Sequence, residues 1–316
     1  MKLQHWMKRE KSGLAFTTLE IVQAEERQGH AVDLRQPDET PLYGGFEGVP
    51  DVHLIHSQIP MRTYHDRIPK FLWTHGEPLS SVGNGVSMKA IVDLAGICEA
   101  FISMRKEEWP IWQSIKKTYV VPKGIDLQRF TPVETPPHDP NDATSKLSGE
   151  PAVLYCEHWR GQRNPLYVCA AMERVAQRYP KARLHMVNCT DPKMLATFKA
   201  LIAHARWSTF IRTLSGPVND AEVNRLYNRA DIVVSALYPL YARSVEAFGA
   251  GKPMICAGYT DPEYPYRCTL DPDSMADAIC AAWENRDGFN ARQWAEQKHD
   301  VDETVRQSVA VYERYL

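Results

Sequence analysis

Short apolar runs alternate along the chain with longer stretches in which apolar residues recur every three or four positions. Residues 2–6 (KLQHW) form the first apolar run and predict a strand. Residues 14–28 then show helical spacing. This helix is expected to turn its apolar residues to one side and its charged residues to the other: Leu14, Leu19, Ile21 and Val22 against Glu25, Glu26 and Arg27.

Gly29 is expected to end this helix, and a second strand follows it in GHAVDL. Turn residues end each further strand candidate in this half of the chain. These candidates are residues 51–57 (DVHLIHS), 70–76 (KFLWTHG), 100–104 (AFISM) and 118–124 (TYVVPKG).

The character of the chain changes after Phe130, where residues 131–150 are dense in Pro, Asp, Thr and Ser. A second series of alternating elements begins at Pro151. Its expected strands are residues 152–156, 182–188, 208–214, 231–237 and 253–257, and its expected helices are 165–179, 193–205, 220–230, 244–251 and 302–316. We therefore expect an N-terminal domain over 1–132, a linker over 133–150, a second domain over 151–290, and a C-terminal segment over 291–316 that packs back towards the first domain.

Strands that alternate with helices predict an α/β protein with parallel sheets covered on both faces. Two such series joined by a linker predict two lobes with a cleft. In sheets of this kind ligands bind beyond the carboxyl ends of the strands, where helix N-termini point.

Composition is that of an ordinary globular chain: 316 residues, 44% hydrophobic, 24% charged, with a formal net charge of -2. This charge argues against general binding to nucleic acid or to an anionic membrane. The seven cysteines are scattered and form no C-x-x-C pair, which favours buried, reduced thiols. No signal peptide or membrane-spanning run is evident, so we expect a cytoplasmic protein with at most peripheral membrane association.

Two common nucleotide-binding motifs are missing from the sequence. No G-x-G-x-x-G follows a strand, and there is no phosphate-loop lysine motif. Hydride transfer with a dinucleotide and ATP hydrolysis are therefore disfavoured.

Three stretches together resemble family-4 retaining glycosyltransferases: residues 120–132 (VVPKGIDLQRFTP), 153–165 (VLYCEHWRGQRNP) and 215–255 (SGPVND…GAGKPMI). The first resembles the strand and turn that end the N-terminal domain of that family. The other two resemble the first strand with its loop and the later half of the second domain. The resemblance implies a GT-B architecture, in which two Rossmann-like domains with parallel sheets face each other across a cleft that holds an activated sugar.

The family resemblance gives a role to the helix expected over 244–251, which should hold Glu246 in its first turn. Glu246 matches the second glutamate of the E-x7-E motif, which accepts hydrogen bonds from the ribose hydroxyls of the donor. The helix N-terminus favours the diphosphate, and the forked cation of Arg243 is expected to add to it. Ser244 and Tyr241, beside Arg243, are assigned to the same donor site. The competing interpretation is a surface pair between Arg243 and Glu246.

The chain departs from the family pattern at Tyr238, where the first glutamate of the motif should stand. Pro239 follows and removes one backbone donor from a loop that normally contacts the sugar. The identity of the donor sugar therefore does not carry over from the family.

The loop after residues 152–156 usually supplies an arginine and a lysine to the leaving diphosphate. In this register His158 takes the arginine position and Arg163 the lysine position, with Arg160 added between them. In the N-terminal domain, Gly13 stands in the family's glycine-rich turn, although Ser12 before it also suits an ordinary helix N-cap. His75 matches the family histidine near the donor sugar, and Glu77 is the nearest carboxylate to orient an acceptor hydroxyl.

The expected catalytic residues are thus His75, Arg163 and Glu246. The resemblance implies retention by a front-face substitution, in which the leaving phosphate oxygen takes the proton of the acceptor. No D-x-D motif is evident, so we expect no metal and no cofactor beyond the nucleoside-diphosphate sugar as co-substrate. With Tyr238 in place of a glutamate, the pair of carboxylates that a glycosidase needs is absent.

The acceptor is the least determined part of the prediction. Lys8, Arg9 and Lys11 lie beside the expected cleft and suit an anionic acceptor, unless they are solvated surface charges. A glycan, a lipid-linked or lipopolysaccharide acceptor, and a hydroxylated base in DNA all remain open. A GT-B sugar-nucleotide epimerase and a non-catalytic binding protein are the alternatives to transfer.

Overall fold

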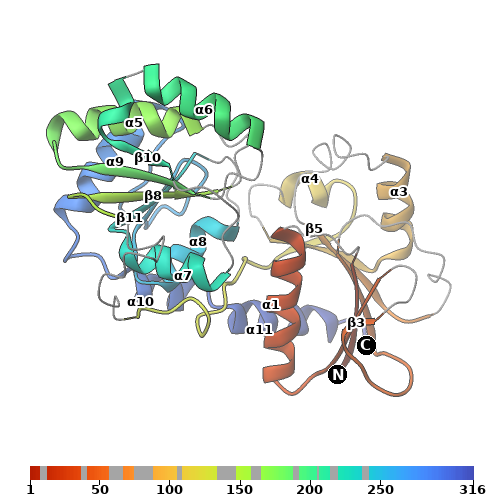
Figure 1. Cartoon of the computed structure of the whole chain (residues 1–316). Helices are drawn as coiled ribbons and strands as arrows, with labels where there is room; N and C mark the ends of the chain where they lie inside the picture. The colour runs from red at the N-terminus through yellow and green to blue at the C-terminus, as the bar shows by residue number, and fades with distance from the viewer. Residues whose placement is uncertain are drawn as a thin grey trace. The chain divides into compact units, whose positions relative to one another are not determined.

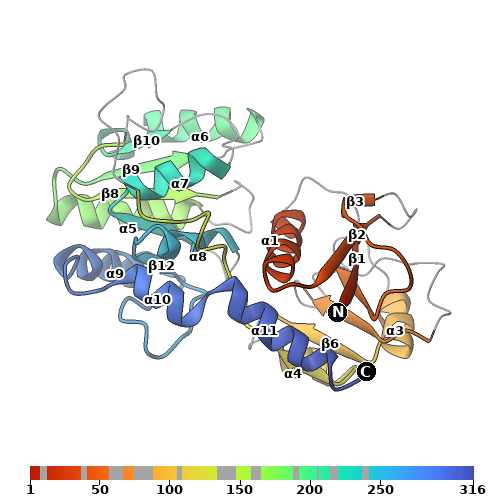
Figure 2. The same ribbon diagram turned by 90° about the horizontal axis from the view of Figure 1, so that it is seen from below.

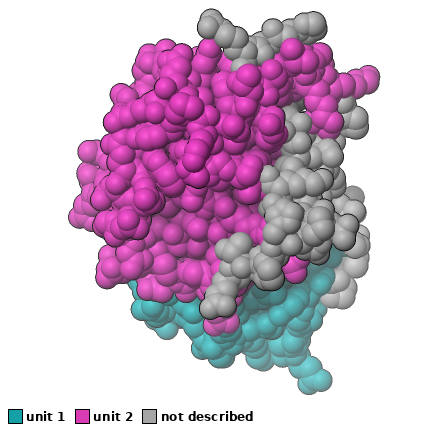
Figure 3. Space-filling model, turned by 60° about the vertical axis from the view of Figure 1, so that its left-hand side comes forward, with its two compact units in different colours: residues 1–126, 298–316 teal, residues 127–297 magenta. Residues whose placement is uncertain are grey.

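The structure is a computed structural model, and two compact units make up its described residues (Figure 3). Unit 1 comprises Met1–Asp126 and Lys298–Leu316, and unit 2 comprises Leu127–Gln297. The described residues are 1–7, 13–36, 41–56, 67–74, 88–104, 109–133, 147–157, 165–187, 192–204, 206–213, 220–236 and 242–316. Most of the expected linker, 133–150, lies outside these ranges.

A seven-stranded sheet, in the order β3-β2-β1-β4-β5-β6-β7, forms the centre of unit 1 within its described residues. Its strands are β1 (Lys2–Met7), β2 (Ala31–Arg35), β3 (Pro41–Gly44), β4 (Val52–His56), β5 (Lys70–Thr74), β6 (Ala100–Ser103) and β7 (Thr118–Val120). Neighbouring strands run parallel except β2 and β3, which pair in antiparallel fashion at one edge. The apolar runs of the sequence form the interior strands, since these are covered on both faces.

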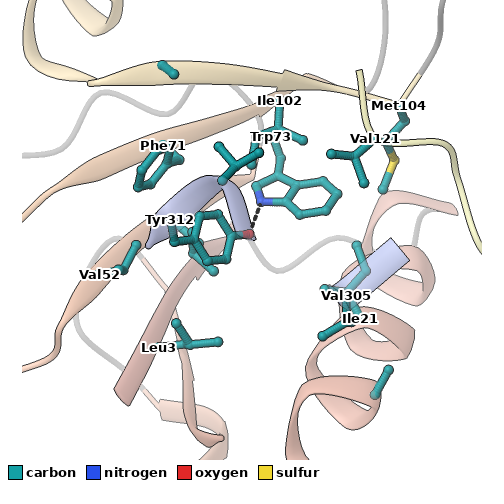
Figure 4. Packing of buried hydrophobic residues seen from close by; sticks show 14 of the residues in the cluster. Leu3, Ile21, Val52, Phe71, Trp73, Ile102, Met104, Val121, Val305 and Tyr312 are labelled. Atoms are coloured by element: carbon teal, nitrogen blue, oxygen red, sulfur yellow. Dashed lines mark hydrogen bonds between the residues drawn. The ribbon is translucent and has the colours of Figure 1, made fainter. Parts of the chain in front are cut away.

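Two helical layers cover this sheet. The helices α1 (Gly13–Arg27) and α11 (Val301–Tyr312) lie side by side on one face (Figures 1 and 2), and their apolar residues pack with Phe71 and Trp73 of β5 (Figure 4). The helices α3 (Met88–Ile97) and α4 (Trp109–Gln113) contribute to the core on the other face, together with Leu72. Consecutive residues of β5 thus serve opposite layers, as the pleat of a strand requires.

Close contacts attach α11, the last helix of unit 1, to the rest of that unit. The indole Nε1 of Trp73 donates a 3.0 Å hydrogen bond to the hydroxyl of Tyr312, and both side chains are fully buried (Figure 4). The hydroxyl of Thr304 donates to the carbonyl of Pro122 at 2.8 Å. A Cβ on Gly124 would collide with the backbone of Val301, so a residue without a side chain is needed there.

Unit 2 contains, within its described residues, a five-stranded parallel sheet in the order β10-β9-β8-β11-β12. Its strands are β8 (Ala152–Cys156), β9 (Arg183–Val187), β10 (Ile211–Thr213), β11 (Ile232–Ser235) and β12 (Met254–Cys256). Figure 1 shows α5 (Pro165–Arg178) and α6 (Pro192–His204) on one side of this sheet, and α7 (Asp220–Arg229) and α8 (Ala242–Gly249) on the other. The described residues of unit 2 form three more helices: the 3-10 helix Arg206–Thr209, α9 (Pro272–Glu284) and α10 (Ala291–Lys298), whose last residue belongs to unit 1.

Candidate functional site

The order of strands in unit 2 places a candidate ligand site at the carboxyl ends of β8 and β11. From β8 the chain passes through α5 to β9 on one side, and from β11 it passes through α8 to β12 on the other. The connections thus diverge between two neighbouring strands, which is the topological switch point where open α/β sheets bind ligands. The residues that follow β8 and β11 are therefore the ones to inspect.

Three buried side chains meet at this edge of the sheet. Glu157 follows β8 directly and is 3% exposed, and its carboxylate accepts a hydrogen bond from the hydroxyl of Ser235, the last residue of β11. Ser235 also contacts the thiol of Cys256 at the end of β12. Burial, and then the nearby charge of Glu157, raise the pKa of the Cys256 thiol to about 12. This cysteine is therefore an uncharged packing group rather than a nucleophile.

Glu246 lies on α8 and is 8% exposed. Its Oε2 accepts a 3.3 Å hydrogen bond from the hydroxyl of Tyr227, a fully buried residue of α7. The expected position in the first turn is wrong: α8 begins at Ala242, so Glu246 is its fifth residue and the first turn has no acidic side chain. The expected helix began at Ser244, but the two residues before Ser244 also adopt helical backbone.

The first turn of α8 contains Arg243 and Ser244, as the second and third residues of the helix. Unsatisfied backbone N–H groups at such a turn give a partial positive charge. One turn further along α8 lies the buried carboxylate of Glu246, which Tyr227 of α7 holds in place. This carboxylate provides an acceptor for hydroxyl groups next to the first turn of the helix, which suits an anion. This pairing of features suits a ligand with both a ribose and a diphosphate.

Asp231, in the ADIVV stretch that resembles the family, has a structural role. Its carboxylate accepts a 2.7 Å hydrogen bond from the backbone N–H of Ala152, at the start of β8. This is the amino end of the sheet, opposite to the candidate site. Burial raises the pKa of Asp231 and lowers that of the neighbouring Lys252.

In unit 1 a row of three buried polar side chains in mutual contact reaches the edge of the sheet formed by the carboxyl ends of its strands. His5 of β1 lies between Glu25 of α1 and His56, the last residue of β4: its Nε2 is 2.6 Å from Glu25 Oε2, and its Nδ1 is 2.8 Å from His56 Nε2. All three side chains are fully buried. The expectation that Glu25 lies on the polar side of the helix with Glu26 is therefore wrong. It stands one turn after Ile21 and so faces the sheet, where the imidazole of His5 is its partner.

Gly13 is the first residue of α1. The remaining expected site residues lie outside the described part of the chain, and their roles stay predictions: Lys8, Arg9, Lys11, His75, Glu77, His158, Arg160, Arg163 and Tyr241. Sequence reasoning missed Ser235, Glu157 and the His5–Glu25–His56 chain as members of these two sheet edges. A polar residue at the end of an apolar strand was the signal available for Ser235 and His56.

Two other kinds of site have no counterpart among the described residues. Among them, no cluster of three or more His, Cys, Asp or Glu side chains is placed to hold a metal ion. No helix in the same residues has the length and apolar character needed to cross a bilayer.

Comparison with known proteins gives similarity in structure alone. No protein-family model matches the chain, and no curated protein matches it by sequence. Sucrose-phosphate synthase from Thermosynechococcus elongatus has a TM-score of 0.70 at 13% identity, covering 100% of this chain and 99% of that one. HepE of Anabaena in complex with UDP-glucose has a TM-score of 0.71 at 14% identity, covering 99% and 100%.

A third solved structure is an alpha-glucosyltransferase in complex with UDP and a 13-mer DNA that contains an HMU base. Its TM-score is 0.68 at 10% identity, covering 99% of both chains. All three are glycosyltransferases with the GT-B architecture. The match extends over nearly the whole length of each chain and includes both sheet-based units. The chain therefore has the GT-B fold of these glycosyltransferases.

Proposed function

We propose that the chain is a glycosyltransferase that moves a sugar from a nucleoside-diphosphate sugar to a hydroxyl group of an acceptor. The observation that carries this proposal is Glu246, a buried carboxylate on the helix that follows the switch point of the unit 2 sheet. The fold supports it, and solved neighbours of that fold hold UDP or UDP-glucose.

In this proposal each end of the donor has its own partner. Glu246 accepts hydrogen bonds from the two ribose hydroxyls, while Tyr227 keeps its carboxylate in place. The first turn of α8, with Arg243, faces the diphosphate. Arg163, with Arg160 and His158, neutralises the charge that grows on the leaving phosphate. The loop that carries these cations begins at Glu157. The hydrogen bond between Glu157 and Ser235 attaches the start of this loop to the end of β11.

The proposed reaction retains the configuration of the sugar. The bond between the anomeric carbon and the phosphate oxygen breaks, the acceptor oxygen bonds to the same face, and its proton passes to the departing diphosphate. The protein then mainly positions the reactants and stabilises charge, for which the proposal requires no metal. Whether a hexose or a pentose is transferred depends on the loop with Tyr238, where the chain departs from the family pattern.

For the acceptor we propose a glycan or a lipid-linked saccharide. A hydroxylated base in DNA is a second candidate, because one neighbour of the same fold is bound to DNA with such a base. The net charge of -2 weighs against it, since DNA binding ordinarily requires a basic surface. Incubation with DNA containing hydroxymethylated pyrimidines, followed by mass analysis of the nucleosides, distinguishes the two candidates.

Slow donor hydrolysis tests the proposal without knowledge of the acceptor. The purified chain is incubated with UDP-, ADP- and GDP-linked sugars, and the release of nucleoside diphosphate is measured. We expect release from one donor class, and its loss in Glu246→Ala and Arg163→Ala. The matched control is Glu296→Ala, which removes a carboxylate that is 52% exposed on α10.

Each failure has a separate meaning. Conversion of the donor to an isomeric nucleotide sugar without release would identify an epimerase. A donor that raises the melting temperature but is never consumed would identify a binding protein. Full activity in the Glu246→Ala variant at limiting donor would show that the site is wrongly placed.

A further inference from the structure

The surface of unit 2 has a depression of about 320 Å³ that none of the donor-site residues lines. We name it the Trp294 depression. It is lined by two aromatic rings, three amides, one carboxylate and a proline: Phe289 and Trp294, Asn290, Gln293 and Gln297, and Glu263, with Pro265 at its wall. Its volume is at the lower end of the range found for small-molecule sites.

Buried side chains and hydrogen bonds hold the aromatic wall of this depression in place. The ring of Tyr264, 1% exposed, lies 5.4 Å from that of Phe289 and 5.7 Å from that of Trp294. Tyr264 is itself fixed to β12, because its hydroxyl donates to the carbonyl of Met254 at 2.6 Å. The indole Nε1 of Trp294 donates to the hydroxyl of Tyr259 at 2.8 Å. Both outer rings are half-buried, so each is held by the core and still presents a surface to solvent.

The amides stand on α10 and at its start. Gln293 and Gln297 are one turn apart and therefore project from the same side of the helix. The Oδ1 of Asn290 accepts a 2.9 Å hydrogen bond from the backbone N–H of Gln293, which fixes the direction of that side chain. All three are exposed. Each side-chain amide has both an acceptor oxygen and N–H donors.

Charge narrows the class of ligand. Glu263 is the charged residue among those that line the depression, and no lysine or arginine is among them. A phosphate or carboxylate ligand would therefore meet repulsion rather than attraction. A neutral saccharide fits this lining, because its hydroxyls pair with amides and a carboxylate while its C–H faces pack against aromatic rings.

We propose that the Trp294 depression binds one neutral sugar residue of an oligosaccharide. The depression holds a glycan against unit 2 independently of the donor site, since Glu157, Ser235 and Glu246 are not among its lining residues. The proposed binding is weak, because a single sugar residue makes only a few hydrogen bonds and one ring contact. The site is preorganised, so binding requires no conformational change.

The test uses the full chain and two uncharged probes, maltohexaose and cellohexaose, with ligand-observed saturation-transfer NMR and calorimetric titration. We expect at least one probe to bind, and the double variant Gln293→Ala/Gln297→Ala to weaken that binding about tenfold or more. Trp294→Phe keeps an apolar ring in the cluster and is expected to weaken it also. The control Gln177→Ala removes an exposed glutamine from α5 and should bind like the wild type.

Two outcomes would overturn the proposal: no binding of either probe at millimolar concentration, or equal binding by the double variant and the wild type. Melting temperatures of all variants show whether the fold is kept. Glu246→Ala should bind the probes unchanged. A failure of this proposal is thus separate from a failure of the donor-site proposal, which is read from donor hydrolysis.

Discussion

Replacement of Ser235 by alanine tests the geometry at the switch point of unit 2. The hydroxyl of Ser235 lies between the carboxylate of Glu157 and the thiol of Cys256, and it is 1% exposed. Its removal takes this donor away from the buried carboxylate of Glu157. A hydrogen bond to a charged group contributes about 1.5–3 kcal/mol to stability.

For a unit of this size, each kcal/mol shifts the melting temperature by about 2–4 °C, so Ser235→Ala should unfold about 3–12 °C below the wild type. The assay is thermal unfolding followed by circular dichroism, with urea denaturation to confirm the free energy. Ser208→Ala, at an exposed serine of the same unit, is the matched control and should change little. The reasoning is refuted if Ser235→Ala and Ser208→Ala unfold at the same temperature.

Three further changes test other parts of the structure. Tyr312→Phe leaves the indole N–H of Trp73 buried without its acceptor and should lower the stability of unit 1 by about 1–3 kcal/mol, measured by urea denaturation; an unchanged midpoint would contradict that contact. Gly124→Ala forces α11 away from its contact at Val301 and should cost about 1–3 kcal/mol, seen as faster proteolysis of the C-terminal segment; wild-type resistance would argue against it. Burial lowers the pKa of His185 below its usual 6.5, so the unfolded chain binds a proton that the folded chain does not, and stability falls as the pH drops through this window. His185→Leu should flatten the decline in stability between about pH 7 and about pH 5 by at most about 1.4 kcal/mol per pH unit, and an equally steep decline would refute the assignment.

Apolar patterning predicted most of the strands of both units, and it predicted the helices α1, α5, α6, α7, α8 and α11. Strands 152–156, 232–235 and 254–256 are buried on both faces, and such strands appear in a sequence as continuous apolar runs. The antiparallel edge strand β3 carries no comparable run and was missed. The helices α3, α4, α9 and α10 were missed as well. For α9, Asp271 and Pro272 are a clear start signal that apolar periodicity does not register.

The site was predictable only in part. The position of Glu246 follows from the resemblance, but its partner Tyr227 comes from another helix and can be found only in the folded chain. Glu157 and Ser235 are 78 residues apart in the sequence, and the sheet order alone brings them together. Glu25 was assigned to the polar side of its helix because it is charged. The sequence around an acidic residue does not indicate that a buried histidine will be its partner in the folded chain.

The most direct test of the central claim, that Glu246 binds the ribose of a nucleoside-diphosphate donor, is calorimetric titration of nucleoside diphosphates. UDP, ADP and GDP are titrated into the wild type and into Glu246→Gln, which keeps the shape of the side chain and removes its charge. We expect one nucleotide to bind the wild type, and its dissociation constant to rise about 10- to 150-fold in the variant, as loss of charge-assisted hydrogen bonds worth about 1.5–3 kcal/mol requires. Equal affinity in the two proteins, or no binding of any of the three nucleotides to the wild type, would contradict the claim.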